Sequence, residues 1–298
     1  MYNQIDSNKR KSFLLIFLFI AFISFLGWIF GQLTDYGYAG LVLAIIISLL
    51  IALFGYYSGD KMALWTAGAK PIQKEANPEI YRLVENLCIT AGLPLPKIYL
   101  IPDAAPNAFA TGRDPQHASL ALTVGLIGMM KKEELEGVIA HELSHVKNYD
   151  IRLMTLVIVL IGIVSLLSNW LMRSFIWGGG RRSDRDDRGQ SGVILMIVGL
   201  VLAILSPFIG QLIQLAISRK REFLADADGA LLTRYPAGLA SALEKISAYA
   251  RPMKSANNAT AHLYISNPFG ASKRNFAKYF STHPPVEERI KALRAMIR

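Results

Sequence analysis

The apolar residues of this chain are concentrated in four long runs that contain no charged residue. These runs occupy positions 12–34, 36–59, 153–172 and 190–218. An apolar stretch longer than about 18 residues can cross the hydrocarbon core of a bilayer as a helix. A cleaved signal peptide would also fit a basic start followed by an apolar run. The first run is too long for one and a second follows almost at once, which favours an uncleaved anchor. The pattern therefore predicts four membrane helices, in two pairs.

The segments outside these runs have the mixed polar and apolar pattern of a soluble domain. Their periodicity predicts helices over about 78–91, 132–148, 237–250 and 286–297 and one through Glu222, with strands over 97–101, 107–112 and 119–125. The chain is predicted to be mainly helical (α+β). Its expected parts are 1–59 with two spans, 60–152 with the first part of the soluble domain, 153–218 with an apolar hairpin and a charged loop at 173–191, and 219–298 with the second part.

The charges beside the apolar runs predict the orientation of the chain in a cell (plasma or inner) membrane. Lys9, Arg10 and Lys11 precede the first run, and basic residues favour the cytoplasmic side. The loop at 173–188 contains five arginines and would lie outside, against this tendency. The last two runs therefore either cross the bilayer or form a hairpin that does not fully cross. The number of crossings is even in both cases, so both termini and both soluble segments are expected in the cytoplasm.

The composition agrees with a membrane protein and excludes several other classes. Hydrophobic residues make up 52% of the chain and the mean hydropathy is +0.33, which is too apolar for an ordinary soluble protein. The net charge of +10 suits either nucleic acid or an anionic bilayer. The basic residues are scattered and no nucleic-acid-binding motif is present, so the lipid bilayer is the expected partner. A transporter would carry charges inside its apolar runs. The single cysteine, Cys88, excludes an internal disulfide framework.

A His-Glu-x-x-His motif is the strongest chemical signal in the chain. It places His141 and His145 four residues apart in the predicted helix 132–148. Residues with this spacing share one face of a helix, so both imidazoles can bind one metal ion. Glu142, beside the first histidine, suits a general base for a water molecule. A chance match to so short a motif is the alternative explanation.

A third metal ligand is expected from a later helix, because a catalytic zinc site uses three protein ligands and an open position. Glu222 is the best candidate, and Asp226 follows it by one helical turn. Asp226 could accept a hydrogen bond from a liganding histidine and so select its tautomer. The alternative is that the two acidic residues form a solvated face beside Arg219 and Arg221. The upstream motif favours coordination.

Together these motifs resemble the HtpX group of M48 zinc metallopeptidases. The resemblance rests on the segments 138–145, 218–226 and 281–285 and on the run Asn-Ala-Phe-Ala-Thr-Gly at 107–112, and it extends over essentially the whole chain. It implies a gluzincin-type peptidase domain, with a small antiparallel sheet in our expectation. It also implies one Zn²⁺ per subunit, an integral membrane location and a role in the quality control of membrane proteins. Unfolded or misfolded membrane proteins are then the expected substrates, whereas the oligomeric state stays undetermined.

The resemblance also assigns roles to individual residues. His141, His145 and Glu222 match the zinc ligands, and Glu142 matches the catalytic base. The stretch Asn107, Ala108, Phe109 and Ala110 matches the edge strand that aligns an extended substrate, and His283 matches a residue that could donate to the tetrahedral intermediate. A structural His283 at the start of the last helix is the alternative. His117 and His262 are expected at the surface.

The resulting hypothesis is a membrane-bound zinc endopeptidase that acts in the stress response on misfolded or damaged membrane proteins. Two other functions stay open. A catalytically silent membrane scaffold of the same fold would lack a ligand or the base, and none is missing from the sequence. A processing peptidase for lipidated peptides, as in a related branch of the superfamily, would resemble a chamber with many more spans than four.

Overall fold

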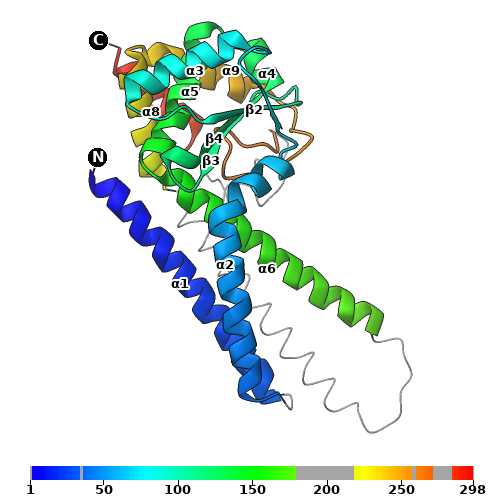
Figure 1. Cartoon of the computed structure of the whole chain (residues 1–298). Coiled ribbons are helices and arrows are strands. Elements are labelled where there is room, and N and C mark those ends of the chain that lie inside the picture. The colour runs from blue at the N-terminus through cyan, green and yellow to red at the C-terminus, as the bar shows by residue number, and fades with distance from the viewer. Residues whose placement is uncertain (1, 34–35, 179–217, 257–259, 271–283, 298) are drawn as a thin grey trace.

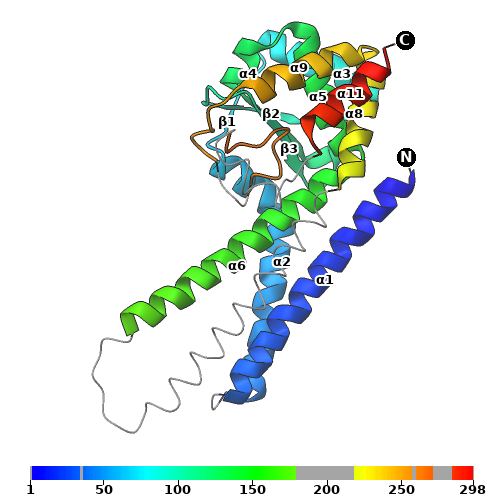
Figure 2. The same ribbon diagram turned by 180° about the vertical axis from the view of Figure 1, so that it is seen from behind.

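The computed structural model describes residues 2–33, 36–178, 218–256, 260–270 and 284–297. It has a globular part at one end and long helices that extend away from it (Figure 1). The long helices are α1 (Tyr2–Leu33), α2 (Tyr38–Thr66) and α6 (Asp150–Gly178). Seen from the opposite side, the N-terminal end of α1 again lies beside the globular part, close to helix α8 (Arg219–Thr233) (Figure 2).

Two helices of the described residues are long and apolar enough to cross a membrane. They cover Gln4–Ile29 and Tyr38–Thr66, each with a hydropathy of 2.6. These segments correspond to the first two predicted runs. The third run lies within α6, and nearly all of the fourth lies outside the described residues. The structure therefore shows two candidate spans in the part of the chain that it describes, where the sequence predicted four for the whole chain.

Helices α1 and α2 pack against each other through glycines. A Cβ atom built on Gly27 would lie 2.1 Å from the Cβ of Ala44, and one on Gly40 would lie 2.7 Å from the backbone oxygen of Gly27. Small residues allow helix backbones to approach this closely, which is a common way for membrane helices to associate. The first two apolar runs therefore form a tight helical pair.

The globular part contains one four-stranded sheet in the order β1-β2-β4-β3. The strands are β1 (Lys70–Pro71), β2 (Lys97–Ile101), β3 (Ala108–Gly112) and β4 (Ala118–Thr123). Strands β1 and β3 pair antiparallel with their neighbours, whereas β2 and β4 are parallel. The prediction of an antiparallel sheet was therefore wrong. The β3–β4 hairpin pairs with β2 through its second strand, β4. Strand β4 therefore lies between β2 and β3 and runs in the same direction as β2.

Helices surround the sheet and form most of the core. They are α3 (Pro78–Ala91), α4 (Val124–Met129), α5 (Lys132–Lys147), α8, α9 (Pro236–Ala248) and α11 (Val286–Ala295), with the 3₁₀ helix η1 (Pro115–His117) before β4. The bounds of α3, α5, α9 and α11 agree with the predicted helices to within about two residues, and α8 contains Glu222 as predicted. Helix α4 was not predicted, and its first two residues had been assigned to a strand. Helix α5 lies at the centre, and its Leu135, Val138, Ile139 and Leu143 are all buried in the core between the sheet and the other helices. The helix that carries the His-Glu-x-x-His motif is thus buried along most of its length.

The two remaining histidines have different environments. The side chain of His117 is 52% exposed, as expected, and its Nδ1 lies 2.6 Å from Asp114. His262 is buried, with its Nε2 atom 3.2 Å from the carbonyl oxygen of Met154 at the start of α6. The expectation that His262 lies at the surface was wrong, because the polar segment around it folds back onto α6.

Candidate metal centre

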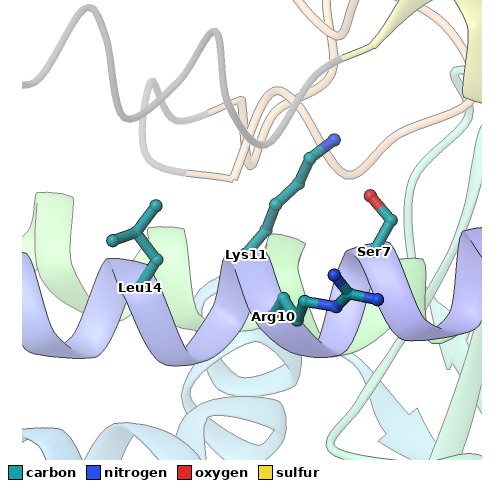
Figure 3. A pocket seen from close by; sticks show the side chains of 4 residues that line it. All are labelled: Ser7, Arg10, Lys11 and Leu14. Carbon is teal, nitrogen blue, oxygen red and sulfur yellow. The ribbon is translucent and has the colours of Figure 1, made fainter.

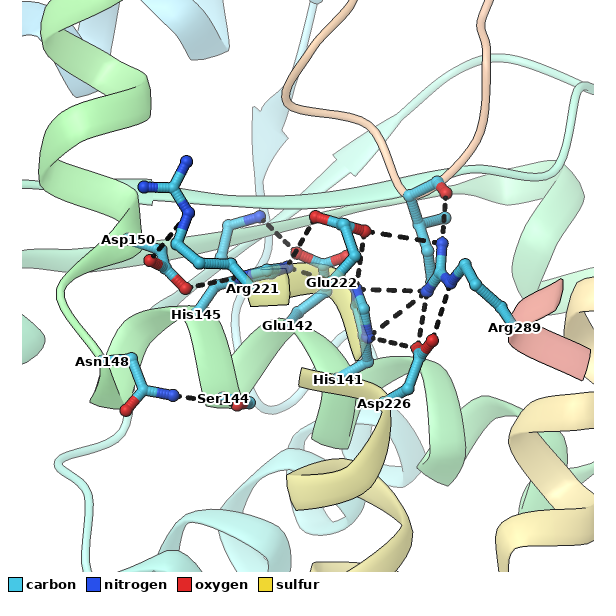
Figure 4. Close-up of polar contacts among 12 residues, drawn as sticks. His141, Glu142, Ser144, His145, Asn148, Asp150, Arg221, Glu222, Asp226 and Arg289 are labelled. Carbon is cyan, nitrogen blue, oxygen red and sulfur yellow. Dashed lines mark hydrogen bonds and ion pairs between the residues drawn. The ribbon is translucent and has the colours of Figure 1, made fainter. Parts of the chain in front are cut away.

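Helix α5 presents two histidines and a carboxylate to a buried centre. His141, Glu142 and His145 are exposed by 1%, 2% and 5% respectively. The Nε2 atoms of His141 and His145 lie 3.2 Å apart, and the two rings are perpendicular (Figure 4). The helical spacing of four residues thus brings both imidazoles to one point, as predicted from the motif.

Glu222 reaches the same point from α8. Its carboxylate oxygens lie 3.6 Å from the Nε2 of His145 and 3.8 Å from the Nε2 of His141. One ligand atom from each of the three residues lies within 4.8 Å of the others. Helix α8 can approach α5 so closely because Gly229 has no side chain; a Cβ there would lie 3.0 Å from the backbone nitrogen of His141. The structure therefore brings together the three residues predicted as ligands.

The tautomers of the two histidines suit a cation between them. The Nδ1 of His141 lies 2.9 Å from Asp226, and the Nδ1 of His145 lies 3.0 Å from Asp150. When the Nδ1–H group of each neutral histidine donates a hydrogen bond to its carboxylate, the Nε2 atom of that ring keeps its lone pair. Two lone pairs that face each other in a buried site are unfavourable without a cation. Tetrahedral zinc with bonds of about 2.0–2.1 Å to nitrogen separates its nitrogen ligands by roughly 3.3 Å, close to the distance seen.

Asp226 is itself held by an arginine from the last helix. Arg289 of α11 is 1% exposed and makes two hydrogen bonds to the Asp226 carboxylate, of 2.8 and 2.7 Å. Its Nη1 atom lies 3.5 Å from Glu222. A bidentate guanidinium fixes both the position and the charge of a carboxylate. Despite its burial, Asp226 has a lowered pKa, because Arg289 and His141 favour its ionised form.

Asp150 lies beside His145 in the same way that Asp226 lies beside His141. It is the first residue of α6, and its Oδ1 atom lies 3.4 Å from the Nε of Arg221 on α8. The side-chain amide of Asn8, from α1, donates a hydrogen bond of 2.6 Å to the same Oδ1 atom. Each histidine is thus oriented by a carboxylate, and each carboxylate is held by an arginine (Figure 4).

The environment of Glu142 suits a group that accepts and releases a proton. Burial raises the pKa of Glu142 to about 7, and the nearby Glu222 carboxylate adds to this effect. The backbone N–H of Ala110 donates a hydrogen bond of 2.9 Å to its Oε2 atom and holds the carboxylate toward strand β3. A general base is most effective when its pKa lies near the working pH.

The pKa values of the two histidines shift in opposite directions. Burial lowers the pKa of His141. At His145 burial also acts to lower the pKa, but the hydrogen bond to Asp150 and the charge of Glu222 outweigh it, and the pKa rises to about 9. The centre therefore attracts positive charge at the position of His145.

The stretch 107–110 lies at the edge of the sheet. The backbone groups of Ala108 and Ala110 point away from β4, toward the open side of β3. There the carbonyl of Ala108 accepts a hydrogen bond of 3.0 Å from the N–H of Ile265. The side chain of Asn107 holds the same later segment, since its Nδ2 donates to the carbonyl of Ser266 at 3.0 Å. Phe109 is fully buried.

Sequence reasoning missed Asp150, Arg221 and Arg289 at this centre, and one expected residue cannot be placed. Asp150 and Arg289 were assigned no role, because an acidic residue at a helix start and a basic residue in a short amphipathic helix look the same whether exposed or buried. The only available signal was the position of Asp150, five residues after His145. His283 lies outside the described residues.

Comparison with known proteins connects this centre to a family of peptidases. The model of Peptidase family M48 matches residues 74–297. A protein described as "Protease HtpX homolog" from Thermoanaerobacter pseudethanolicus is 46% identical over 296 residues, which cover 99% of this chain and 98% of that protein. One of the same description from Lactobacillus helveticus is 43% identical over 300 residues, covering 99% and 100%. The crystal structure of Ste24p from S. mikatae has a similar fold, with 19% identity and a TM-score of 0.50 over 98% of this chain and 67% of that chain.

Proposed function

The chain belongs to peptidase family M48 and is a metallopeptidase, and from this premise we propose that it is a membrane-bound, zinc-dependent endopeptidase. The proposal is supported chiefly by the buried cluster of His141, His145 and Glu222, in which the Nε2 atoms of the two histidines lie 3.2 Å apart. These three residues would hold one Zn²⁺ per subunit, and the donor set of two imidazoles and a carboxylate suits that ion. Zinc bound there would supply Lewis-acid chemistry, which polarises a carbonyl group and acidifies water.

The residues around the ligands would carry the proton and position the substrate. Glu142 takes a proton from the attacking water and delivers it to the leaving amine, as its pKa of about 7 allows. Asp226 and Asp150 keep the histidines in the tautomer that binds the metal. We propose that His283 donates a hydrogen bond to the oxygen of the tetrahedral intermediate, since it matches the family pattern at that position.

An extended peptide would bind beside strand β3, along residues Asn107 to Ala110. Addition of a strand uses main-chain hydrogen bonds and so tolerates many sequences. Strand β3 suits this role, because it lies at the edge of the sheet and the backbone N–H of Ala110 donates a hydrogen bond to Glu142. The bond from Ile265 to Ala108 occupies part of this edge, so the substrate would displace that segment.

We propose that the substrates are misfolded or damaged membrane proteins, degraded in a stress response. The cluster lies close to the membrane helices, because α6 begins three residues after the helix that carries the motif. The proposed protein crosses the membrane four times, and two of these spans are candidate spans in the described residues. An even number of crossings would keep the peptidase part and both termini in the cytoplasm. Residues 60–152 and 219–298 would form the peptidase domain, with 153–218 as a second membrane hairpin between them.

The decisive experiment compares the full chain with Glu142→Gln for cleavage of an unfolded test protein in detergent, with zinc and with a chelator. Zinc-dependent cleavage by the wild type, lost in the variant while its zinc content is unchanged, is the expected result. Equal activity in both proteins would indicate a contaminant. A zinc-loaded wild type that cleaves none of several unfolded proteins, and no prenylated peptide, would favour the scaffold function. Cleavage of the prenylated peptide alone would favour the processing of lipidated peptides.

A further inference from the structure

We infer that Asn8, near the start of the first membrane helix, is a positioning residue for the metal ligand His145 and acts through Asp150. The inference rests on the proposed function, and it gives α1 a part in the chemistry in addition to anchoring the chain. Asn8 lies more than 130 residues from His145 in the sequence and belongs to a helix that supplies no ligand. The hydrogen bonds of Asn8 and Asp150 and the packing of α1 against α6 carry the argument.

The amide of Asn8 holds both ends of the turn between α5 and α6. Its Nδ2 atom donates one hydrogen bond of 2.8 Å to the carbonyl of Asn148 and another of 2.6 Å to Oδ1 of Asp150. The other oxygen of Asp150, Oδ2, lies 3.0 Å from the Nδ1 of His145. One carboxylate therefore links the Asn8 amide to the liganding imidazole, with a separate oxygen for each partner.

The remaining atom of the amide is also in use. The Oδ1 of Asn8 accepts a hydrogen bond of 3.3 Å from Arg221, the neighbour of the ligand Glu222 on α8. Asn8 is only 1% exposed. A buried amide is costly unless its polar atoms are hydrogen-bonded, and here both the donor and the acceptor are. The buried amide of Asn8, in the polar first part of α1, thus has a specific set of partners.

The turn that Asn8 contacts depends on outside support. Tyr149 occupies the turn with a φ of 59°, a backbone conformation that non-glycine residues adopt at a cost. The ammonium group of Lys9 lies 4.6 Å from the centre of the Tyr149 ring. Two consecutive residues of α1 therefore contact all three residues of the turn. Further along, Leu15 and Phe19 pack against α6 and keep α1 in place.

The two faces of α1 have separate roles. The residues Asn8, Ser12, Leu15 and Phe19 are buried and recur with helical spacing. On another side of the helix, Ser7, Arg10, Lys11 and Leu14 line a cavity of about 420 Å³ (Figure 3). Arg10 and Lys11 thus belong to the side of the cavity, whereas Asn8 points into the protein. The charge of Lys11 also interacts with Asp150 and Arg221, whereas the hydrogen bond from α1 to Asp150 comes from the Asn8 amide.

Loss of the Asn8 amide is expected to leave the His145 ring less firmly oriented. Without the Asn8 amide, Asp150 loses its shortest hydrogen bond and keeps the longer contact of 3.4 Å to Arg221. The carboxylate can then rotate away from the Nδ1 of His145. Loss of groups that orient a metal ligand typically weakens metal binding about 10–100-fold, and we expect about tenfold here because Asn8 acts one residue further away.

The test uses the full chain in detergent and two substitutions with different properties. Asn8→Leu keeps the branching of the side chain at Cγ but removes its hydrogen bonds, and Asn8→Asp keeps the shape but places a carboxylate against Asp150. Ser12→Ala is the matched control, because Ser12 is buried on the same face and, among the residues that the structure describes, its hydroxyl bonds only to the carbonyl of Asn8, within the helix. Zinc affinity is measured by competition with a chromophoric chelator, and the ligand geometry by the visible spectrum of the Co²⁺-loaded protein.

We expect both Asn8 variants to bind zinc about tenfold more weakly and to show an altered cobalt spectrum, while Ser12→Ala resembles the wild type. Wild-type affinity and spectrum in both Asn8 variants would overturn the inference and leave the peptidase function intact. Equal weakening in all three variants would also overturn it, because it would indicate a general packing effect. A wild type that binds no metal would overturn the proposed function as well. If Asn8→Asp does not fold, Asn8→Leu decides.

Discussion

At the scale of single residues, the centre consists of charges that are buried only because each has a partner. Asp226 accepts two hydrogen bonds from Arg289 and one from His141, and all three residues are at most 1% exposed. An unpaired charge at this depth would be strongly destabilising. The arrangement therefore selects both the tautomer of the histidine and the position of the last helix.

The substitution Asp226→Asn is expected to weaken zinc binding about 10–100-fold, because a neutral amide holds the Nδ1 proton of His141 less firmly. The affinity is measured by competition with a chelator. Asp228→Asn is the matched control: Asp228 lies on the same helix and bonds to Ser144 and Asn148, away from the ligand atoms. Equal affinities of the two variants would show that the hydrogen bond from His141 does not orient the ligand.

At the scale of elements, α5 is fixed between the sheet and α9 by apolar packing and by Glu134. The carboxylate of Glu134 accepts hydrogen bonds of 2.6 Å from both Ser241 and Lys245 on α9. It also accepts a bond of 2.7 Å from the N–H of Lys131, at the start of its own helix. Burial acts to raise the pKa of Glu134, but these bonds outweigh it and the pKa is lowered.

A lowered pKa means that Glu134 stabilises the fold above its ordinary pKa of 4.5 and that this contribution is lost as the pH falls through the folded-state pKa. Glu134→Gln should therefore reduce stability by about 1–2 kcal/mol at pH 7, and the difference should shrink below pH 4.5. Thermal unfolding of the purified chain, followed by circular dichroism, measures this. Glu136→Gln, on the exposed side of α5, should have little effect at either pH.

The contact between α5 and α9 also depends on Gly137. A Cβ atom there would lie 2.8 Å from the backbone nitrogen of Leu239, so α9 would have to move. Gly137→Ala should destabilise the protein by about 1–3 kcal/mol, although alanine is the better helix former. Gly128→Ala in α4 is the control, because a Cβ there meets nothing within 4 Å. A higher unfolding temperature for Gly137→Ala than for the wild type would contradict the close contact.

At the scale of the whole molecule, α1 and α2 form an antiparallel pair whose far turn and globular end should lie on opposite sides of a bilayer. The contact of Asn8 with Asp150 agrees with this arrangement, because it places the start of α1 beside the globular part. The basic residues at the start of α1 predict that the globular side faces the cytoplasm, because such residues favour that side of a membrane.

Cysteine labelling tests this topology in a Cys88→Ala background. In intact spheroplasts, a membrane-impermeant thiol reagent should label Tyr36→Cys, at the far turn, and leave Glu75→Cys unlabelled until the cells are lysed. Both positions are exposed on the protein, so access depends on the membrane alone. Labelling of Glu75→Cys in intact spheroplasts would reverse the proposed orientation.

The sequence by itself determined the features that depend on local spacing. Helices such as α3 and α5 follow from apolar periodicity, and the pairing of His141 with His145 follows from four residues of helix. Glu222 was predicted as the third ligand because a catalytic zinc site needs one and because its motif resembles that of a family, and the structure places it beside the two histidines. Only the tertiary structure decided the parallel pairing of β2 with β4 and the meeting of Asn8, Asp150 and Arg221. The physical reason is distance along the chain: hydrophobic periodicity reports which side of an element is buried, but not which polar group of a remote element it will face there.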